Sequence, residues 1–152
     1  MSFAWSFLDV SASIEGPGGG FTLGGPDTGT AEEGVNIEPK GDVNIMTEGA
    51  DGSWMHSLRA SKGGTLTVTL LRNSPTNAKL QAMLNYQRSS ARYHGRNTVT
   101  IRQVVSGDLI PCEGVAFAKQ PGIPFAVEGG KLAWVFDVGR FEPTLGAGMT
   151  EV

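Results

Sequence analysis

The sequence predicts a mainly β domain with one flanking α-helix, arranged as a β-sandwich or rolled barrel with the helix on its side. Apolar and polar residues alternate with the two-residue period of a strand along most of the chain. The 22 glycines and 8 prolines indicate many turns, at a share below that of disordered chains. At 152 residues, we expect a single domain over residues 1–152.

The first predicted strand lies within residues 8–15, where apolar residues at even positions alternate with polar ones. The polar set is Asp9, Ser11, Ser13 and Glu15. The aromatic residues of segment 3–7 have the opposite parity, which predicts a bulge or bend at Phe7–Leu8. Glycine-rich residues 16–20 predict a turn, after which residues 21–23 begin a return strand.

Residues 24–52 are expected to form a long protruding arm, because they begin with a polar, glycine-rich stretch. Within this arm, Val35 and Ile37 are predicted to pair with Val43 and Ile45 around the turn at 39–41. The arm would thus be partly ordered as a small hairpin.

A further hairpin is predicted to join strand 53–59 to strand 65–70 through the turn at 62–64. The apolar residues of the second strand would face the core. Its polar residues would face away; they are Thr65, Thr67 and Thr69.

The single helix is predicted over residues 75–90. Ser74 is a natural N-cap, and Pro75 suits the first helical position. Arg88 and Arg92 fall near the C-terminal end, where positive charge complements the helix dipole. Strands near 98–102, 109–118 and 131–138 follow, and the last is apolar at nearly every position, which predicts burial on both faces.

Groups that could carry chemistry are scattered along the chain. His56 and His94 are the only histidines, and neither has a partner at metal-ligand spacing. Cys112 is the only cysteine, so no internal disulfide can form, and its place in a strand indicates a buried thiol. Glu32–Glu33 lies in an exposed segment and is interpreted as solvated. We therefore expect no enzyme activity, metal or cofactor.

Targeting signals are equally weak. No apolar run approaches the roughly 20 residues of a membrane helix, and the N-terminus lacks the basic region of a signal peptide. We expect the chain to fold in a cytoplasm. The net charge of −3 argues against a protein that grips nucleic acid by neutralising phosphates.

Charges are sorted along the chain. Residues 1–51 carry a net −8, residues 52–120 a net +7 and the remainder a net −2. Two interpretations stay open. The oppositely charged parts neutralise each other within one fold, or they attract neighbouring copies head to tail into rings or filaments.

The chain resembles the tail tube proteins of contractile-tailed bacteriophages. The segments that carry the resemblance are 7–14 with the following Gly-Pro-Gly-Gly turn, 31–35, 50–53, 55–58, 71–77 and 134–137. None is a catalytic signature; together they form a pattern of turns and strand faces that spans most of the chain.

This resemblance implies a tail-tube-like β-sandwich or barrel whose sheets join those of neighbouring subunits into an inner barrel. Six copies would form a ring, and rings would stack into a hollow tube, as in the related type VI secretion and R-type pyocin tubes. The implied partners are further copies of the chain, the tail sheath, the tape measure protein, the baseplate and the tail terminator. DNA would pass through the lumen without specific binding, and the tube would belong to the virion tail, assembled in the host bacterial cytoplasm.

Two sets of site residues are expected under this hypothesis. Candidates for contacts between rings are Asp27, Glu32, Glu33, Glu38, Asp42, Glu48, Arg88, Arg92 and Arg96. Candidates for the lumen wall are Asp9, Ser11, Ser13, Glu15, Thr65, Thr67 and Thr69. Two alternatives remain: a monomeric small-molecule-binding β-barrel, or another virion component such as a terminator or decoration protein.

Overall fold

The computed structural model describes residues 4–147. The strands in this range are β1 (Val10–Gly16), β2 (Gly19–Gly24), β3 (Thr30–Pro39), β4 (Asn44–Glu48), β5 (Trp54–Leu58), β6 (Gly64–Leu71), β7 (Asn97–Gln103), β8 (Asp108–Phe117), β9 (Lys131–Val138) and β10 (Arg140–Phe141). One α-helix, α1 (Pro75–Gln87), and 3-10 helices at Phe7–Asp9 and Ala91–Tyr93 complete the described elements. The mainly β fold with a single α-helix is confirmed.

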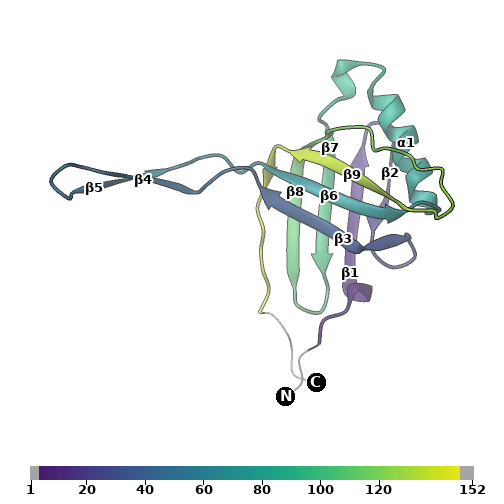
Figure 1. The fold of residues 1–152 in the computed structure, drawn as a ribbon, viewed down its shortest axis with the longest axis horizontal. Helices are drawn as coiled ribbons and strands as arrows, with labels where there is room; N and C mark the ends of the chain where they lie inside the picture. Colours follow the sequence, from purple (N-terminus) through teal and green to yellow (C-terminus); the bar gives the residue numbers. More distant parts are fainter. Residues whose placement is uncertain (1–3, 148–152) are drawn as a thin grey trace.

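The body of the molecule is one antiparallel sheet rolled into two layers. Its strand order is β2-β1-β7-β8-β9-β6-β3, with β10 added beside β8. In Figure 1, β3, β6 and β9 cross in front of β1, β7 and β8. Strand β8 belongs to both layers, since it pairs with β7 along most of its length and with β9 at Ala116 and Phe117. Gly114, with φ of 62°, lies just before that change of partner, where a left-handed backbone favours glycine.

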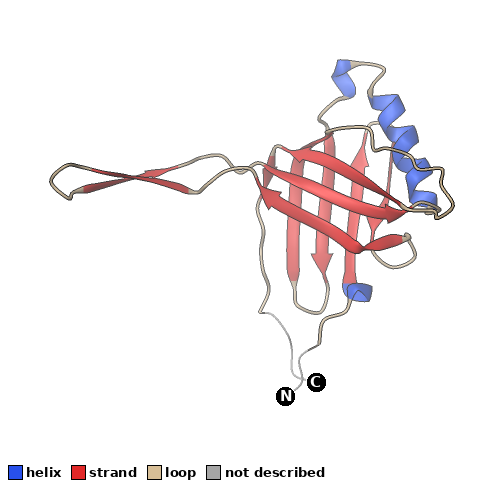
Figure 2. Cartoon of the chain, in the orientation of Figure 1, coloured by secondary structure: helices blue, strands red, loops and turns tan. Residues whose placement is uncertain are grey.

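The core lies between the two layers and is closed at one side by α1 (Figure 2). Alternate residues of the strands point inward, as their two-residue period predicts. The fully buried side chains include Ala12 and Ile14 of β1, Leu66, Val68 and Leu70 of β6, Trp134 and Phe136 of β9, and Leu80 of α1. Among the helices of the described residues, none has the length and hydropathy needed to cross a membrane.

Helix α1 begins as predicted and ends earlier. The hydroxyl of Ser74 accepts a hydrogen bond from the Thr76 backbone over 3.2 Å, which confirms the N-cap. The helix ends at Gln87 rather than at residue 90, and Arg88 is its C-cap. Ser90 has extended backbone angles and caps the following 3-10 helix by accepting from Arg92. The chain therefore leaves the helical path at this serine.

The N-terminal bend takes a different form from the predicted one. Residues 7–9 form a 3-10 helix capped by Ser6, whose hydroxyl accepts from the Leu8 backbone over 3.1 Å. Strand β1 therefore starts at Val10, and its irregularity lies between Ala12 and Ser13, opposite β2. Asp9 belongs to the 3-10 helix and not to the strand. Phe3 lies outside the described residues.

Both predicted hairpin pairings are wrong. Val35 and Ile37 belong to β3 and pair with Val68 and Leu66 of β6, while β4 pairs with β5. The predicted arm at 24–52 is therefore displaced: residues 30–39 lie in the main sheet, and the projecting segment runs from 40 to 63 (Figure 1). The prediction paired strands by proximity in sequence. Strand β3 instead pairs across the whole projecting segment, because its apolar side chains complete the core.

Strand β9 is buried on one face and not on both. Leu132, Trp134, Phe136 and Val138 are buried, whereas Ala133 and Asp137 are exposed. The near-continuous apolar run misled the prediction because its outward positions carry small residues, Ala133 and Val135, which a solvated face tolerates.

Candidate assembly surfaces

The most exposed part of the described chain is the projecting segment 40–63, here called the arm. Its two strands, β4 and β5, form a separate sheet, here called the blade, in which every residue is exposed. Large apolar side chains exposed on the arm are Val43, Ile45, Met46, Trp54, Met55 and Leu58. In Figure 1 the blade extends far from the rest of the molecule.

The register of the blade places these apolar residues on both of its faces. Met46 pairs with His56 and lies on one side, whereas Ile45 pairs with Ser57 and lies on the other. Trp54 and Leu58, at 70% and 83% exposure, share the side of Met46. A lone two-stranded ribbon is marginally stable in water. An apolar surface of this kind marks a site of contact with another protein.

The tip of the blade is internally bonded. The Asp51 carboxylate accepts hydrogen bonds from the Ser53 backbone over 3.0 Å and from the Ser53 hydroxyl over 2.5 Å. These bonds lower the pKa of Asp51, the hydroxyl bond being the largest cause. The turn is therefore held by hydrogen bonds between its own residues, and the exposed side chains of β4 and β5 remain free to contact another molecule.

The acidic candidates for contacts between rings do not form one patch. Asp42 lies in the arm and Glu48 in its blade, whereas Glu32, Glu33 and Glu38 lie on β3 in the body. Asp27 lies in the turn between β2 and β3, with φ of 62°.

Glu33 already has a partner within the chain. Its carboxylate accepts a hydrogen bond from the Lys131 ammonium over 2.7 Å. This bond is the main cause of the lowered pKa of Glu33 and of the raised pKa of Lys131. Glu38 accepts from the Asn36 side-chain amide over 3.0 Å. Part of the sequence's charge asymmetry is thus neutralised inside the fold.

The basic candidates are gathered within nine residues at one end of the molecule. Arg88 caps α1, Arg92 lies in the second 3-10 helix, and Arg96 precedes β7. All three are exposed, and none forms an ion pair with another described residue. The rings of Tyr86 and Tyr93 stack beside them with centroids 5.0 Å apart. The structure therefore places three exposed arginines in the segment that follows the helix.

The two groups of lumen candidates lie on opposite sides of the sandwich. Thr65 and Thr67 point outward from β6; Thr67 is paired with Asn36 of β3 and with Val135 of β9. We call the outward surface of β3, β6 and β9 the threonine face. Ser11, Ser13 and Glu15 point outward from β1, beside Arg102, Thr100 and Thr98 of β7. We call the outward surface of β1 and β7 the serine face. Because the inward side chains of both layers share one core, these faces look away from each other.

The two faces differ in their exposed apolar residues. Near one end of the serine face, Leu8, Val104, Val105, Leu109 and Leu145 are large and exposed. Backbone bonds bring them together, since Val104 donates to Asp9 and Leu109 pairs with Thr144. Among the described residues of the threonine face, the only large exposed apolar residue is Leu71, at its end. The serine face therefore has the character of a protein-contact surface at that end.

The two histidines and the cysteine considered as catalytic candidates lie in separate parts of the fold. His56 is exposed on the blade, with its Nδ1 3.0 Å from the Asn44 amide, and His94 is exposed after the second 3-10 helix. Cys112 is buried in β8, and burial raises the pKa of its thiol to about 11. In residues 4–147, no group of three or more His, Cys, Asp or Glu side chains is placed to hold a metal ion.

A family model and a solved structure match this chain. A family model described as "Bacteriophage PhiTE tail tube protein" matches residues 1–146. The cryo-EM structure of the anti-feeding prophage cap, a tube terminating cap, is similar with a TM-score of 0.52 and 8% sequence identity. The match covers 96% of this chain and 94% of that chain, and at this identity it is a likeness of fold. No curated protein sequence matches.

Proposed function

Because this chain belongs to the bacteriophage PhiTE tail tube protein family, we propose that it is the repeating subunit of a tail tube. As a family member it is a structural protein of a phage tail. In the proposal, six copies form each ring, rings stack into a hollow tube inside a contractile sheath, and the tube conducts DNA. The subunit acts by shape and surface, without catalysis. It would assemble in the host bacterial cytoplasm.

The observation that carries this proposal is the blade. Its apolar side chains have no cover within the described part of the chain, although they occupy both sides of the ribbon. A surface of this kind is stabilised when it packs on another molecule. In a tube every subunit has further copies beside it, and heterologous contacts between identical copies close into rings or extend into filaments.

Free strand edges give a second route to assembly. Strands β2 and β3 end the strand order of the main sheet, so each has one edge without a partner strand in the described residues. Strand β3 is 10 residues long. Edges of this length invite pairing with another chain. Joining them between neighbours would produce the continuous inner barrel.

Of the two polar faces, we assign the threonine face to the channel. Its central side chains are short: Thr67 lies between Asn36 and Val135, and Thr69 lies opposite Ala133. The serine face carries the apolar cluster described above, which suits a protein partner better than water. Thr65 and Thr67 are therefore proposed to line the lumen. Thr69, the third threonine expected there, is buried within the subunit and is not part of this wall. Ser11, Ser13 and Glu15 are proposed to face outward.

The charges of the threonine face support this assignment. Lys40 is paired with Asp137 over 2.6 Å, and Lys131 is paired with Glu33 over 2.7 Å. Both lysines are thus neutralised locally. A wall without free cations would let DNA slide, because phosphate binding depends on neutralisation by lysine and arginine. On the serine face, Arg102 is exposed and forms no ion pair with another described residue.

Contacts between rings are proposed to pair the arm's acids with the cationic end of α1. Asp42 and Glu48 belong to the arm, whereas Arg88, Arg92 and Arg96 belong to the segment at and after the end of the helix. Glu32 and Asp27 are proposed to contribute from the body. Glu33 and Glu38 contribute less, since each already accepts a hydrogen bond within the chain.

Further partners follow from the position of a tube in a tail. The sheath, tape measure protein, baseplate and tail terminator are proposed to bind the assembled tube. The apolar end of the serine face, around Leu109 and Val104, is the surface that we propose for protein partners outside the lumen.

Negative-stain electron microscopy of the purified protein tests the proposal. Hollow tubes or stacked rings are expected. Single closed rings that never extend would instead indicate a terminator. A protein that stays monomeric at high concentration and low salt, and that melts at a higher temperature with a small apolar ligand, would indicate a ligand-binding barrel.

A further inference from the structure

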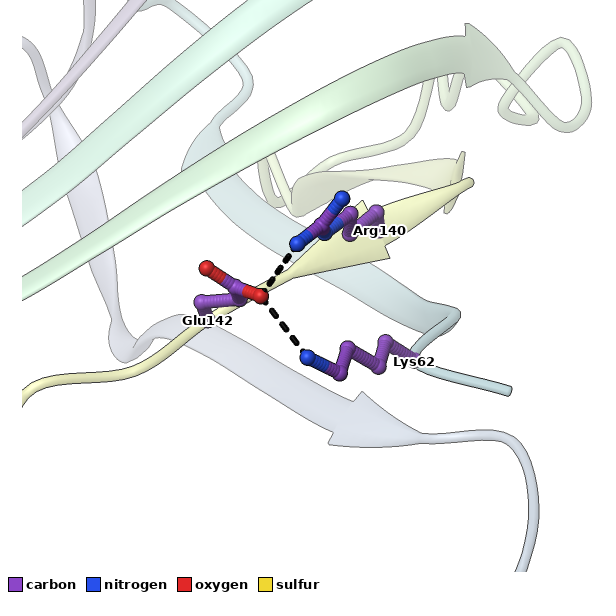
Figure 3. Close-up of polar contacts among 3 residues, drawn as sticks. All are labelled: Lys62, Arg140 and Glu142. Atoms are coloured by element: carbon purple, nitrogen blue, oxygen red, sulfur yellow. Dashed lines mark hydrogen bonds and ion pairs between the residues drawn. The ribbon is translucent and has the colours of Figure 1, made fainter. Parts of the chain in front are cut away.

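The base of the arm is tied to the body by charged side chains. In the segment that leads out to β4, the Lys40 ammonium donates to the Asp137 carboxylate over 2.6 Å. In the segment that returns from β5, the Lys62 ammonium donates to the Glu142 carboxylate over 2.8 Å. The same oxygen of Glu142 accepts from the Arg140 guanidinium over 2.5 Å (Figure 3). Glu142 is therefore the acceptor that links the arm to the segment after β10.

Backbone contacts hold the same two segments together. The Phe141 amide donates to the Lys62 carbonyl over 3.0 Å, and the Lys40 amide donates to the Gly63 carbonyl over 3.1 Å. The ring of Phe141 covers Gly64, where an added Cβ would lie 2.5 Å from the ring. Strand β10 is itself paired to β8 in the body. Residues 140–142 thus form a strap across the segment that returns from the arm to β6.

Little chain separates this strap from the blade. The next backbone bond outward joins the Arg59 amide to the Val43 carbonyl over 2.9 Å. Between it and the bond from Lys40 to Gly63 lie Gly41 and Asp42 on one strand and residues 60–62 on the other. Only this short connection separates the base of the arm from the blade.

Exposed ion pairs of this kind contribute little to folding stability. Their side chains here are about half exposed, yet three of the four ion pairs among the described residues lie at the base of the arm. Their location fits a role in orientation better than a role in stability. Fixing the direction of a binding element before contact reduces the ordering cost of association.

We propose that Glu142 is a positioning residue for assembly. Together with Lys62 and Arg140 it holds the arm in one direction in the isolated subunit, so that the blade meets its neighbour already oriented. The consequence for assembly rests on the proposed tube function. The orientation of the arm itself does not, and the two can be measured separately.

The direct test is a distance measurement across the arm in the isolated protein. Spin labels at Ala50→Cys in the tip turn of the blade and Thr98→Cys on β7 report the distance between the arm and the body, because both positions are exposed and neither needs a left-handed backbone. Native Cys112 is buried and its thiol pKa is raised, so it stays unlabelled. The labelled protein is compared with and without Glu142→Gln. Glu128→Gln is the matched control, since it removes the same charge from an exposed loop residue without an ion pair to another described residue.

A narrow distance distribution is expected for the labelled protein and for Glu128→Gln, and a clearly broader one for Glu142→Gln. At about 1 M salt, where the screening length is about 3 Å, the parent should broaden toward the variant. The melting temperature of the isolated Glu142→Gln protein should equal that of the parent, while its critical concentration for assembly rises several-fold. A distribution as narrow as the parent's would overturn the proposal.

Lys62→Met provides a second variant, because it removes the ammonium group that donates to Glu142 and keeps an unbranched apolar side chain. It should reproduce the broadening seen with Glu142→Gln. If both variants keep a narrow distribution, the strap does not orient the arm. If the parent never assembles but the variants broaden, the positioning role stands and the tube function fails.

Discussion

The indole nitrogen of Trp134 donates a hydrogen bond to the side-chain oxygen of Asn77 over 3.0 Å, and both side chains are buried. The Asn77 amide nitrogen in turn donates to the backbone carbonyls of Leu71 and Arg72 over 2.9 and 3.2 Å. One asparagine therefore joins the first turn of α1 to β9 and to the end of β6. This link holds the helix against the layer that we assign to the channel.

Asn77→Ala is expected to destabilise the isolated subunit by roughly 2–3 kcal/mol. The change leaves the Trp134 N–H without its acceptor in the core, and a buried unsatisfied group costs about 1–3 kcal/mol. Urea unfolding followed by far-ultraviolet circular dichroism measures the difference. Asn85→Ala on the exposed side of the same helix should change stability by less than about 0.5 kcal/mol. Equal losses for both variants would contradict the role given to Asn77.

Replacing residues 43–59 by a short glycine-serine linker should leave the stability of the isolated subunit almost unchanged. The blade has no buried residue, so its removal uncovers no core. Assembly into tubes should be abolished, because the apolar surface of the blade is lost. Thermal unfolding and electron microscopy of the same preparation give the two readouts. Tubes formed without the blade would refute its part in assembly.

Local signals in the sequence were sufficient to predict most helices and strands, but not to predict which strands pair with each other. Ser74 and Pro75 marked the start of α1, and alternation marked β1, β6 and β9, because caps and strand faces depend on residues close in sequence. The pairing of β3 with β6 could not be read, since it joins residues separated by the whole arm and depends on completing the core. The ion pair of Glu33 with Lys131, 98 residues apart, was hidden for the same reason.

Glu32→Lys should weaken assembly and leave folding intact, and it separates contacts between subunits from contacts within one. Glu32 is exposed on β3, and no described residue forms an ion pair with it. The critical concentration for tube formation should rise several-fold at low salt, and the difference should shrink at high salt. Light scattering across a concentration series measures it.

Glu33→Lys is the informative comparison for that variant. It breaks the bond of Glu33 with Lys131 and places two ammonium groups side by side. Its effect on the isolated subunit should therefore exceed that of Glu32→Lys, although both changes alter the charge equally. If Glu32→Lys lowers the melting temperature of the isolated subunit more than Glu33→Lys does, the charges of β3 serve the fold and not the assembly.

Thr67→Cys and Ser13→Cys distinguish the two faces. A maleimide attached to a bulky polymer is too large to enter a narrow channel and react with a thiol on its wall. In assembled tubes, Thr67→Cys should be protected and Ser13→Cys should react, because we place the threonine face inside. Both should react in the dissociated subunits. Cys112 gives little background, since burial raises the pKa of its thiol to about 11. The opposite pattern of protection would assign the serine face to the lumen.

The ion pairs of Glu142 at the base of the arm should persist in mild acid. Hydrogen bonds from Lys62 and then Arg140 lower the pKa of Glu142 from its ordinary 4.5 to about 2. The Glu142 carboxylate therefore keeps its negative charge below its ordinary pKa and loses it, with both ion pairs, as the pH falls through the lowered value. The distance distribution between labels at positions 50 and 98 should therefore stay narrow from pH 7 to about pH 4 and broaden only near pH 2.

Glu113, which lies opposite Arg140, and Asp137, which holds Lys40, are the other carboxylates at this base. The Glu142→Gln protein separates their effects from that of Glu142, because its distribution should be broad at every pH. Broadening of the parent between pH 6 and pH 4, with Glu142→Gln unchanged across that range, would mean that Glu142 titrates near its ordinary pKa and is not held by the two cations.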